Sequence, residues 1–184
     1  MTVYIGLLRG VNVGGVKLPM ADLRRIAAEI GLDDVSTYIQ SGNMVFTTRR
    51  RDEKKLASEL TAAIKADVGI APAVVLRTAA ELSKAIAANP FPTDGVDPKT
   101  LHVIFFAEPV DPAVHDGLDL SEYEPEQVTV HGRELYLSLP NGIGRSPLAT
   151  DLGRRKSVKI GTARNWRTVL TLADLAAAAA GKRN

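Results

Sequence analysis

A glycine-rich stretch with two cations is the first part of the sequence that can do chemistry. Residues 9–17 read Arg-Gly-Val-Asn-Val-Gly-Gly-Val-Lys and lie between a predicted strand and a predicted helix. Glycines let backbone N–H groups turn toward an anion, and the start of a helix adds a favourable dipole. Arg9 and Lys17 add positive charge. The stretch lacks the Gly-Lys-Ser/Thr of a P-loop and is not GxGxxG, so a tight strand-to-helix connection without a ligand is the alternative.

A second polar cluster, Tyr38-Ile39-Gln40-Ser41-Gly42-Asn43, offers amide and hydroxyl groups. Serine, glycine and asparagine also favour turns, so a hairpin chosen for its backbone is the alternative. In a ferredoxin-like unit the first two strands are parallel and flank the third, so this turn and the glycine-rich stretch share one edge of the sheet. They are then roughly 10 Å apart, which is close enough for one ligand to touch both.

The third candidate is the stretch Leu139–Ser146, which reads Leu-Pro-Asn-Gly-Ile-Gly-Arg-Ser. The basic stretch Arg154-Arg155-Lys156 and then Arg164-Asn165-Trp166 follow it. Arginine presents a planar fork that suits phosphate or carboxylate. Trp166 can stack on a flat ligand, but its helical spacing with Val169 and Leu170 favours a place in the core.

Other chemistries have little support in the sequence. His102, His115 and His131 show no metal-ligand spacing, so no metal site is predicted, and no cofactor can be named. The chain has no cysteine and no GxSxG motif, which removes thiol and serine-hydrolase mechanisms. The acidic groups at 33–34 and 122–126 are expected to be solvated loops and not a catalytic pair.

The order of predicted elements repeats along the chain. The first set comprises strands over 3–8, 35–40, 43–47 and 73–76, and helices over 19–30 and from 52. A capping-box pattern, Thr-Ala-Ala-Glu, starts a helix at 78 that ends at 89. The second set comprises strands over 101–106, 127–130, 134–139 and 158–160, and helices over 111–117, from 146 and from 165. Hairpin turns are predicted at Ser41-Gly42 and His131-Gly132.

The order β-α-β-β-α-β is the ferredoxin-like arrangement, and it occurs twice. The sequence therefore predicts an α+β protein with two ferredoxin-like subdomains, antiparallel or mixed sheets and a long C-terminal helix. We expect residues 1–90 to form the first subdomain with its following helix, 91–99 to be a linker rich in proline, and 100–184 to form the second subdomain.

Composition and charge limit the class of protein. The 184 residues are 45% hydrophobic and 24% charged, as in ordinary globular domains. No apolar run reaches membrane-spanning length, the start shows no signal-peptide pattern and cysteine is absent, so we expect a cytoplasmic protein without a membrane partner. Residues 92–140 carry 2 basic and 10 acidic groups, whereas 141–184 carry 9 and 2. Such segregation indicates an anionic partner for the basic end, two segments that face each other, or surfaces that are simply solvated.

Four strings together resemble the signature blocks of the bacterial family called domain of unknown function 1697. They are LLRGVNVGG, TYIQSGNMVF, LPNGIGRSPL and ARNWRTVLTL. The resemblance runs from Tyr4 to Leu172 and departs at Thr162-Ala163, where the family often has two threonines. It implies a cytoplasmic α+β protein with two ferredoxin-like subdomains, and it carries over no catalytic residue.

The sequence thus favours a binding domain for an anionic small ligand, such as a nucleotide or a phosphorylated metabolite. The alternatives are an enzyme acting on such a ligand, a nucleic-acid-binding domain and a homo-oligomeric interaction module. A phosphate-bearing small molecule is favoured over nucleic acid because the acidic segment would repel an extended polyanion. The candidate ligand-binding residues are Arg9, Gly10, Asn12, Gly14, Gly15, Lys17, Gln40, Ser41, Asn43, Arg145, Arg164, Asn165 and Trp166.

Overall fold

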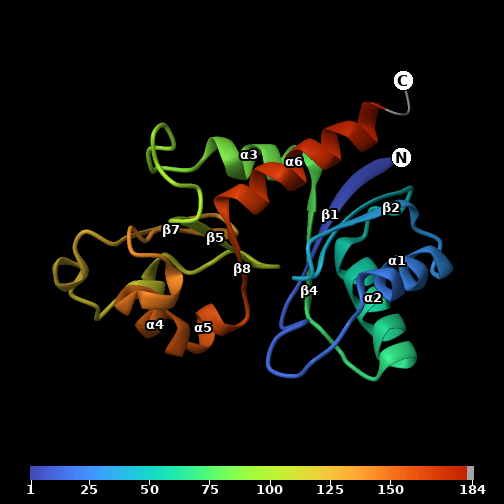
Figure 1. The fold of residues 1–184 in the computed structure, drawn as a ribbon, viewed down its shortest axis with the longest axis horizontal. Helices are drawn as coiled ribbons and strands as arrows, with labels where there is room; N and C mark the ends of the chain where they lie inside the picture. The colour runs from blue at the N-terminus through green and yellow to red at the C-terminus, as the bar shows by residue number, and fades with distance from the viewer. Residues whose placement is uncertain (182–184) are drawn as a thin grey trace. The chain divides into compact units, whose positions relative to one another are not determined.

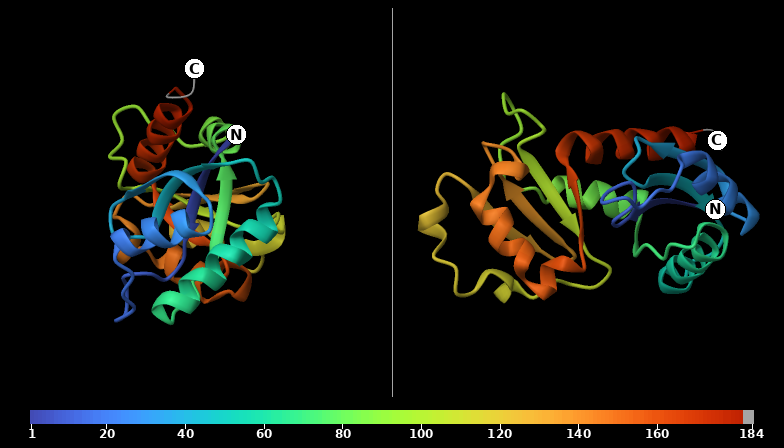
Figure 2. Two further views of the ribbon diagram at one scale, coloured as in Figure 1. Left: turned by 90° about the vertical axis from the view of Figure 1, so that its right-hand side faces the viewer. Right: turned by 60° about the horizontal axis from the view of Figure 1, so that its bottom comes forward.

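The computed structural model describes residues 1–181, and its contacts group them into two units (Figures 1 and 2). Unit 1 holds residues 1–83 and the C-terminal stretch from Thr171, and unit 2 holds Lys84–Leu170. The boundaries fall inside two helices, α3 (Ala79–Ala87) and α6 (Trp166–Gly181). No helix of residues 1–181 is long and apolar enough to cross a membrane.

Unit 1 is built on a four-stranded antiparallel sheet with the strand order β2-β3-β1-β4. The bounds are β1 (Thr2–Leu8), α1 (Met20–Glu29), β2 (Asp33–Tyr38), β3 (Asn43–Thr48), α2 (Glu53–Val68) and β4 (Val74–Thr78). This is the ferredoxin-like order, as predicted. The hairpin at Ser41-Gly42 is confirmed, because β2 and β3 pair antiparallel across it.

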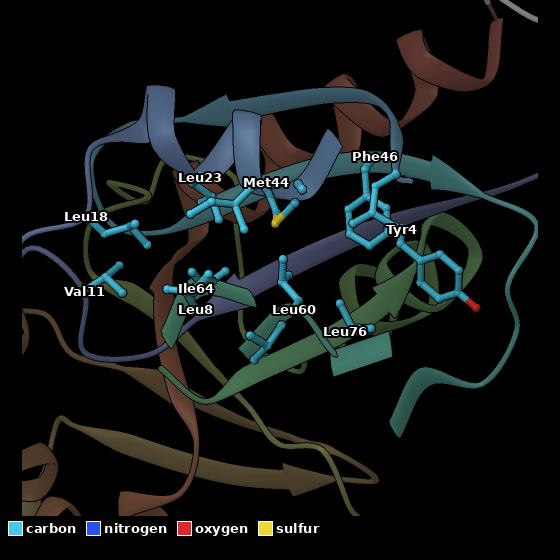
Figure 3. Packing of buried hydrophobic residues seen from close by; sticks show 14 of the residues in the cluster. Tyr4, Leu8, Val11, Leu18, Leu23, Met44, Phe46, Leu60, Ile64 and Leu76 are labelled. Atoms are coloured by element: carbon cyan, nitrogen blue, oxygen red, sulfur yellow. The ribbon is translucent and has the colours of Figure 1, made fainter. Parts of the chain in front are cut away.

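One face of this sheet packs on α1 and α2 (Figure 3). Alternate strand residues such as Tyr4, Leu8 and Phe46 meet helix residues such as Leu23 and Leu60, and all five are almost completely buried. Alternation with period two on the strands and a three-to-four spacing on the helices directs these side chains to the same layer. The resulting core holds the segment that follows β1, because buried side chains anchor that segment at both ends.

Unit 2 repeats the strand order as β6-β7-β5-β8, again antiparallel throughout. The bounds are β5 (Leu101–Phe105), β6 (Gln127–His131), β7 (Glu134–Ser138), α4 (Pro147–Arg154), α5 (Lys156–Lys159) and β8 (Thr162–Asn165). The predicted hairpin at His131-Gly132 is confirmed, with Gly132 at a φ of 60° in the first central position of the turn.

Two predicted elements of unit 2 differ from the structure. The helix expected over 111–117 is only a 3₁₀ helix, Pro112–His115, which Asp111 caps. The strand expected at 158–160 is wrong, since Val158 is buried within α5 and packs into the second core. The closing strand is β8 instead, because its residues alternate between buried and exposed positions beside β5.

The last strand of each sheet ends in the same way. Arg77 pairs with Ile5 in unit 1, and Arg164 pairs with Val103 in unit 2. Both arginines are buried, and each is followed by a helix-capping residue and then by a helix that crosses the unit boundary. The repeat therefore extends beyond element order to a strand–arginine–cap–helix sequence. The division into a first subdomain of residues 1–90, a linker of residues 91–99 and a second subdomain of residues 100–184 remains our proposal.

Candidate functional site

The glycine-rich stretch and the hairpin turn of unit 1 lie at the same edge of its sheet. The Leu8 N–H donates to the Gly42 carbonyl over 2.8 Å, and Asn12 Nδ2 donates to the Gln40 carbonyl over 2.6 Å. The predicted convergence is confirmed, because β1 ends where the antiparallel β3 begins. We call the surface formed by residues 9–17, 39–43 and 70–73 the loop edge.

Asn12 holds the glycine-rich stretch in shape. At a φ of 55° its side chain folds back on Leu18, whose N–H donates to Oδ1 over 2.8 Å and whose carbonyl accepts from Nδ2 over 2.9 Å. Together with the bond to Gln40, these contacts engage the whole amide. Asn12 is therefore a positioning residue for the stretch.

Two buried side chains fix the ends of the stretch to the core of unit 1 (Figure 3). Val11 is 3% exposed and Leu18 is completely buried. Between them the chain turns outward, and the Val16 N–H donates to the Val13 carbonyl over 3.0 Å. Gly14 and Gly15 occupy the two centres of this turn at φ of 57° and 86°, the combination of a type I′ turn.

The tip of the stretch presents unpaired N–H groups. Within residues 1–181, the N–H groups of Gly10, Gly14, Gly15 and Lys17 donate to no protein acceptor. A Cβ at any of the three glycines would meet nothing within 4 Å, so their backbone is open to solvent. Successive free N–H groups of this kind form concavities that attract anions.

A hollow of about 490 Å³ borders the stretch at Arg9, Gly10 and Val16. Its lining combines the guanidinium-bearing Arg9 and the backbone of Gly10 with apolar groups of Val16 and the segment 70–73. The Arg9 N–H donates to the Ala73 carbonyl over 2.9 Å, which joins the two sides. Arg9 and Lys17 are exposed, and within residues 1–181 neither side chain forms an ion pair or hydrogen bond.

The hairpin turn has a mainly structural role, because it packs against the glycine-rich stretch. A Cβ at Gly42 would lie 2.5 Å from Val11 Cγ2 and 2.8 Å from Leu8 Cβ, so only glycine allows the two loops to meet. Asn43 is completely buried and donates to the Tyr38 carbonyl over 3.1 Å and to Ser41 Oγ over 3.0 Å. Gln40 is exposed, as is the neighbouring apolar Ile39.

The candidates in unit 2 occupy interior and capping positions, with one exception. Arg145 is exposed at the end of a 3₁₀ helix. Trp166 is only 4% exposed, and Asn165 Oδ1 accepts the Thr168 N–H over 2.9 Å at the start of α6. Arg164 Nη1 donates to Thr162 Oγ1 and to the Ala163 carbonyl, each over 2.8 Å. Burial lowers the pKa of Arg164 to about 10.

The segments that carry these residues meet at one end of the second sheet. The Leu139 N–H donates to the Thr100 carbonyl over 2.8 Å, and Asn165 pairs with His102 on the other side of β5. The spacing of His102 in the sequence excludes it as a metal ligand but does not indicate its burial. His102 is buried, its Nδ1 has no hydrogen-bond partner within residues 1–181, and burial lowers its pKa. The signal was a histidine within an otherwise apolar strand.

Comparison with known proteins places the chain in a family. The model of a family described as "Protein of unknown function (DUF1697)" matches residues 1–136. The chain belongs to this family. The matched range contains the first two blocks of the sequence resemblance, and the blocks LPNGIGRSPL and ARNWRTVLTL lie beyond it.

A solved structure shares the fold of this member of the family. It is the conserved bacterial protein SP0830 from Streptococcus pneumoniae, with a TM-score of 0.73 and 21% sequence identity. The similarity covers 96% of this chain and 98% of that one. A search of curated proteins gives no match. The fold is thus shared almost end to end with this bacterial protein.

The acidic segment 92–140 and the basic segment 141–184 contact each other inside unit 2 through hydrogen bonds between charged side chains and neutral groups. Glu126 Oε2 accepts Ser146 Oγ over 2.8 Å and the Leu148 N–H over 3.0 Å, so it caps α4. Arg155 donates to the Val114 carbonyl over 3.0 Å and to the Asp116 carbonyl over 2.9 Å. The expectation that 122–126 is a wholly solvated acidic loop is wrong for Glu126, because the start of α4 requires its carboxylate.

Within residues 1–181 no three histidine or acidic side chains gather in a way that could hold a metal ion. The candidate site is therefore the loop edge of unit 1, where backbone donors and cations have no partners among the described residues. It combines free backbone donors and unpaired cations beside a hollow, which together can hold an anion.

Proposed function

We propose that this protein binds an anionic small ligand, such as a nucleotide or a phosphorylated metabolite, at the loop edge of unit 1. The observation that carries the proposal is the set of free N–H groups at Gly10, Gly14 and Gly15. These lie within one short stretch that also contains the unpaired Arg9 and Lys17. Backbone donors and an arginine fork are the groups that proteins use to hold phosphate.

Each part of the loop edge has a role in this proposal. Arg9 supplies a charged, planar donor, and the glycines supply neutral donors that need no side-chain ordering. Val16 and the segment 70–73 give the hollow an apolar side, which suits the non-phosphate part of a ligand. Asn12 takes no part in binding and acts by fixing the path of the stretch.

A small ligand fits this surface better than a nucleic acid does. Tight binding to a duplex draws on about 6–10 phosphate contacts. The stretch supplies only Arg9 and Lys17 as cations. Arg164 and Trp166, the residues that would have added charge and a stacking ring, are buried.

We also propose that the protein acts in the cytoplasm, as expected for a chain whose sequence contains no cysteine.

The test is a titration of the full chain with inorganic phosphate, adenosine monophosphate and a short single-stranded DNA, at about 50 mM and about 200 mM salt. We expect the mononucleotide to bind more tightly than the DNA and Arg9→Ala to weaken its binding by about tenfold, the loss of one charged hydrogen bond. Analysis of the nucleotide after incubation separates binding from turnover.

Arg49→Ala is the matched control. Arg49 is an exposed arginine of unit 1 that follows β3, at the end of the sheet opposite to Arg9, because β1 and β3 run antiparallel. It should leave binding unchanged. Equal losses in the two variants, or absence of binding by every probe at low salt, would contradict the proposal.

A further inference from the structure

A second hollow lies in unit 2, along the first half of β6. Its volume is about 500 Å³. Its lining includes the segment Pro90-Phe91-Pro92 and residues of the stretch 120–126. Gln127, Val128 and Thr129 of β6 complete the lining. The hollow is therefore bordered by the backbone of a strand as well as by side chains.

This strand is at the border of its sheet. β6 pairs with β7 alone, and among residues 1–181 no strand pairs with its other side. A two-residue turn joins β6 to β7, so His131 and Glu134 form a hydrogen-bonded pair next to the turn. Because such pairs alternate along an antiparallel ladder, the N–H and C=O groups of Val128 and Val130 point to the open side.

The surroundings leave this edge free for pairing. Pro90 and Pro92 have no N–H, so the nearby segment has few donors to offer the carbonyls of β6. Phe91 between them is half-buried and gives this side an apolar contact. Unpaired strand edges are templates for the addition of an extended chain.

Charge selects the kind of chain. Residues 90–129 contain nine acidic side chains and one lysine. Glu124 lines the hollow and is exposed, Glu122 is exposed two residues before it, and neither forms an ion pair within residues 1–181. Glu126 is occupied by α4 and does not contribute.

We propose that β6 accepts an extended, cationic peptide segment of a partner protein as an additional strand. The segment pairs through the backbone groups of Val128 and Val130, places an apolar residue against Phe91 and places lysine or arginine near Glu122 and Glu124. The edge from Gln127 to Val130 accommodates about four residues of the partner, roughly 13 Å of strand. Main-chain bonds supply affinity in this mode, and side chains supply selectivity.

The experiment uses a fluorescein-labelled peptide of alternating lysine and valine and the same peptide with N-methyl groups on alternate residues. Methylation removes the donors that pair with an edge but keeps charge and side chains. We expect the parent peptide to bind, the methylated peptide to bind about tenfold more weakly, and a glutamate–valine peptide not to bind. In NMR spectra, the amide signals of Val128 and Val130 should shift most.

Charge reversal supplies the protein-side test. Glu124→Lys should weaken peptide binding by about tenfold, whereas Asp174→Lys, the same change at an exposed site of α6, should leave it unchanged. Phe91→Ala should also weaken it. Equal binding of the parent and methylated peptides, equal effects of the two reversals, shifts centred elsewhere or no binding at low salt would each overturn the proposal.

Discussion

The two sheets have the same strand order, yet they use similar residue types for different purposes. In unit 1 the polar residues at the end of β1 hold a loop whose backbone donors are free. In unit 2 the residues around the start of β5 have structural roles, because Arg164 is buried and Asn165 caps a helix. Arginine, asparagine and glycine therefore indicate a binding surface only where their hydrogen-bond donors have no partner within the protein.

The largest expected difference between the units comes from Trp166. Because this ring is only 4% exposed, Trp166→Ala should lower the free energy of unfolding by roughly 3–5 kcal/mol. Urea denaturation followed by circular dichroism measures the loss. Arg9→Ala in unit 1 should change the unfolding free energy by less than about 0.5 kcal/mol, since its side chain is exposed. Comparable losses in the two variants would remove the contrast.

Gly42 and Gly14 sharpen the comparison inside unit 1. Both have positive φ, but a Cβ at Gly42 would lie 2.5 Å from Val11, whereas one at Gly14 would meet nothing. Gly42→Ala should cost about 2–4 kcal/mol from strain and overpacking, and Gly14→Ala about 1 kcal/mol from backbone strain alone. Thermal melting of the two variants tests this. A Gly14 variant as unstable as the Gly42 variant would mean that the tip is packed.

His102 makes the stability of unit 2 depend on pH. The unfolded chain takes up a proton near pH 6.5, whereas burial lowers the pKa of His102 in the folded state. Between these pKa values the unfolded state binds more protons, so stability falls as the pH drops below about 6.5, by about 1.4 kcal/mol for each unit of pKa difference. The measurement is unfolding by urea at about pH 7.5 and about pH 5.5.

His102→Gln should reduce this dependence, and His131→Gln, at the exposed hairpin of the same sheet, should not. A pH dependence that is unchanged in His102→Gln would assign it to other groups.

Effects of about 1 kcal/mol are expected at the two helix caps that follow the buried arginines. Thr78 Oγ1 accepts the Glu81 N–H over 3.2 Å, and Asn165 Oδ1 accepts the Thr168 N–H over 2.9 Å. Thr78→Ala and Asn165→Ala should each lower the free energy of unfolding by about 1 kcal/mol. The two losses should be similar if the two helix starts are equivalent. Equilibrium unfolding of both variants is the check. A loss several times larger at one of them would show that the repeat is not matched in energy.

Much of the fold could be predicted because local signals agreed with long-range packing. Both hairpins, the capping box at Thr78 and the shared edge of the two loops follow from turn chemistry and strand order. The placement of β8 was missed because Val158 has strand propensity but packs as a helix residue into the core.

The candidate site was harder to predict. The sequence alone does not show which polar groups have hydrogen-bond partners within the protein. The presence of such a partner distinguishes a structural residue from one that is free to bind a ligand. Asn12, Asn43 and Asn165 look like ligand-binding residues by type, but each is engaged by the fold. The sequence does not show which backbone N–H groups lack an acceptor; its only indication is the glycines at these positions.

The most direct measurement is an NMR titration of the isotopically labelled full chain with inorganic phosphate and then adenosine monophosphate. We expect the amide signals of Gly10, Gly14 and Gly15 to shift together and saturate, while those of Arg164, Asn165 and Trp166 do not move. Shifts centred on residues 141–145 and 164–167, or no saturable shift at the three glycines, would contradict a ligand site at the loop edge.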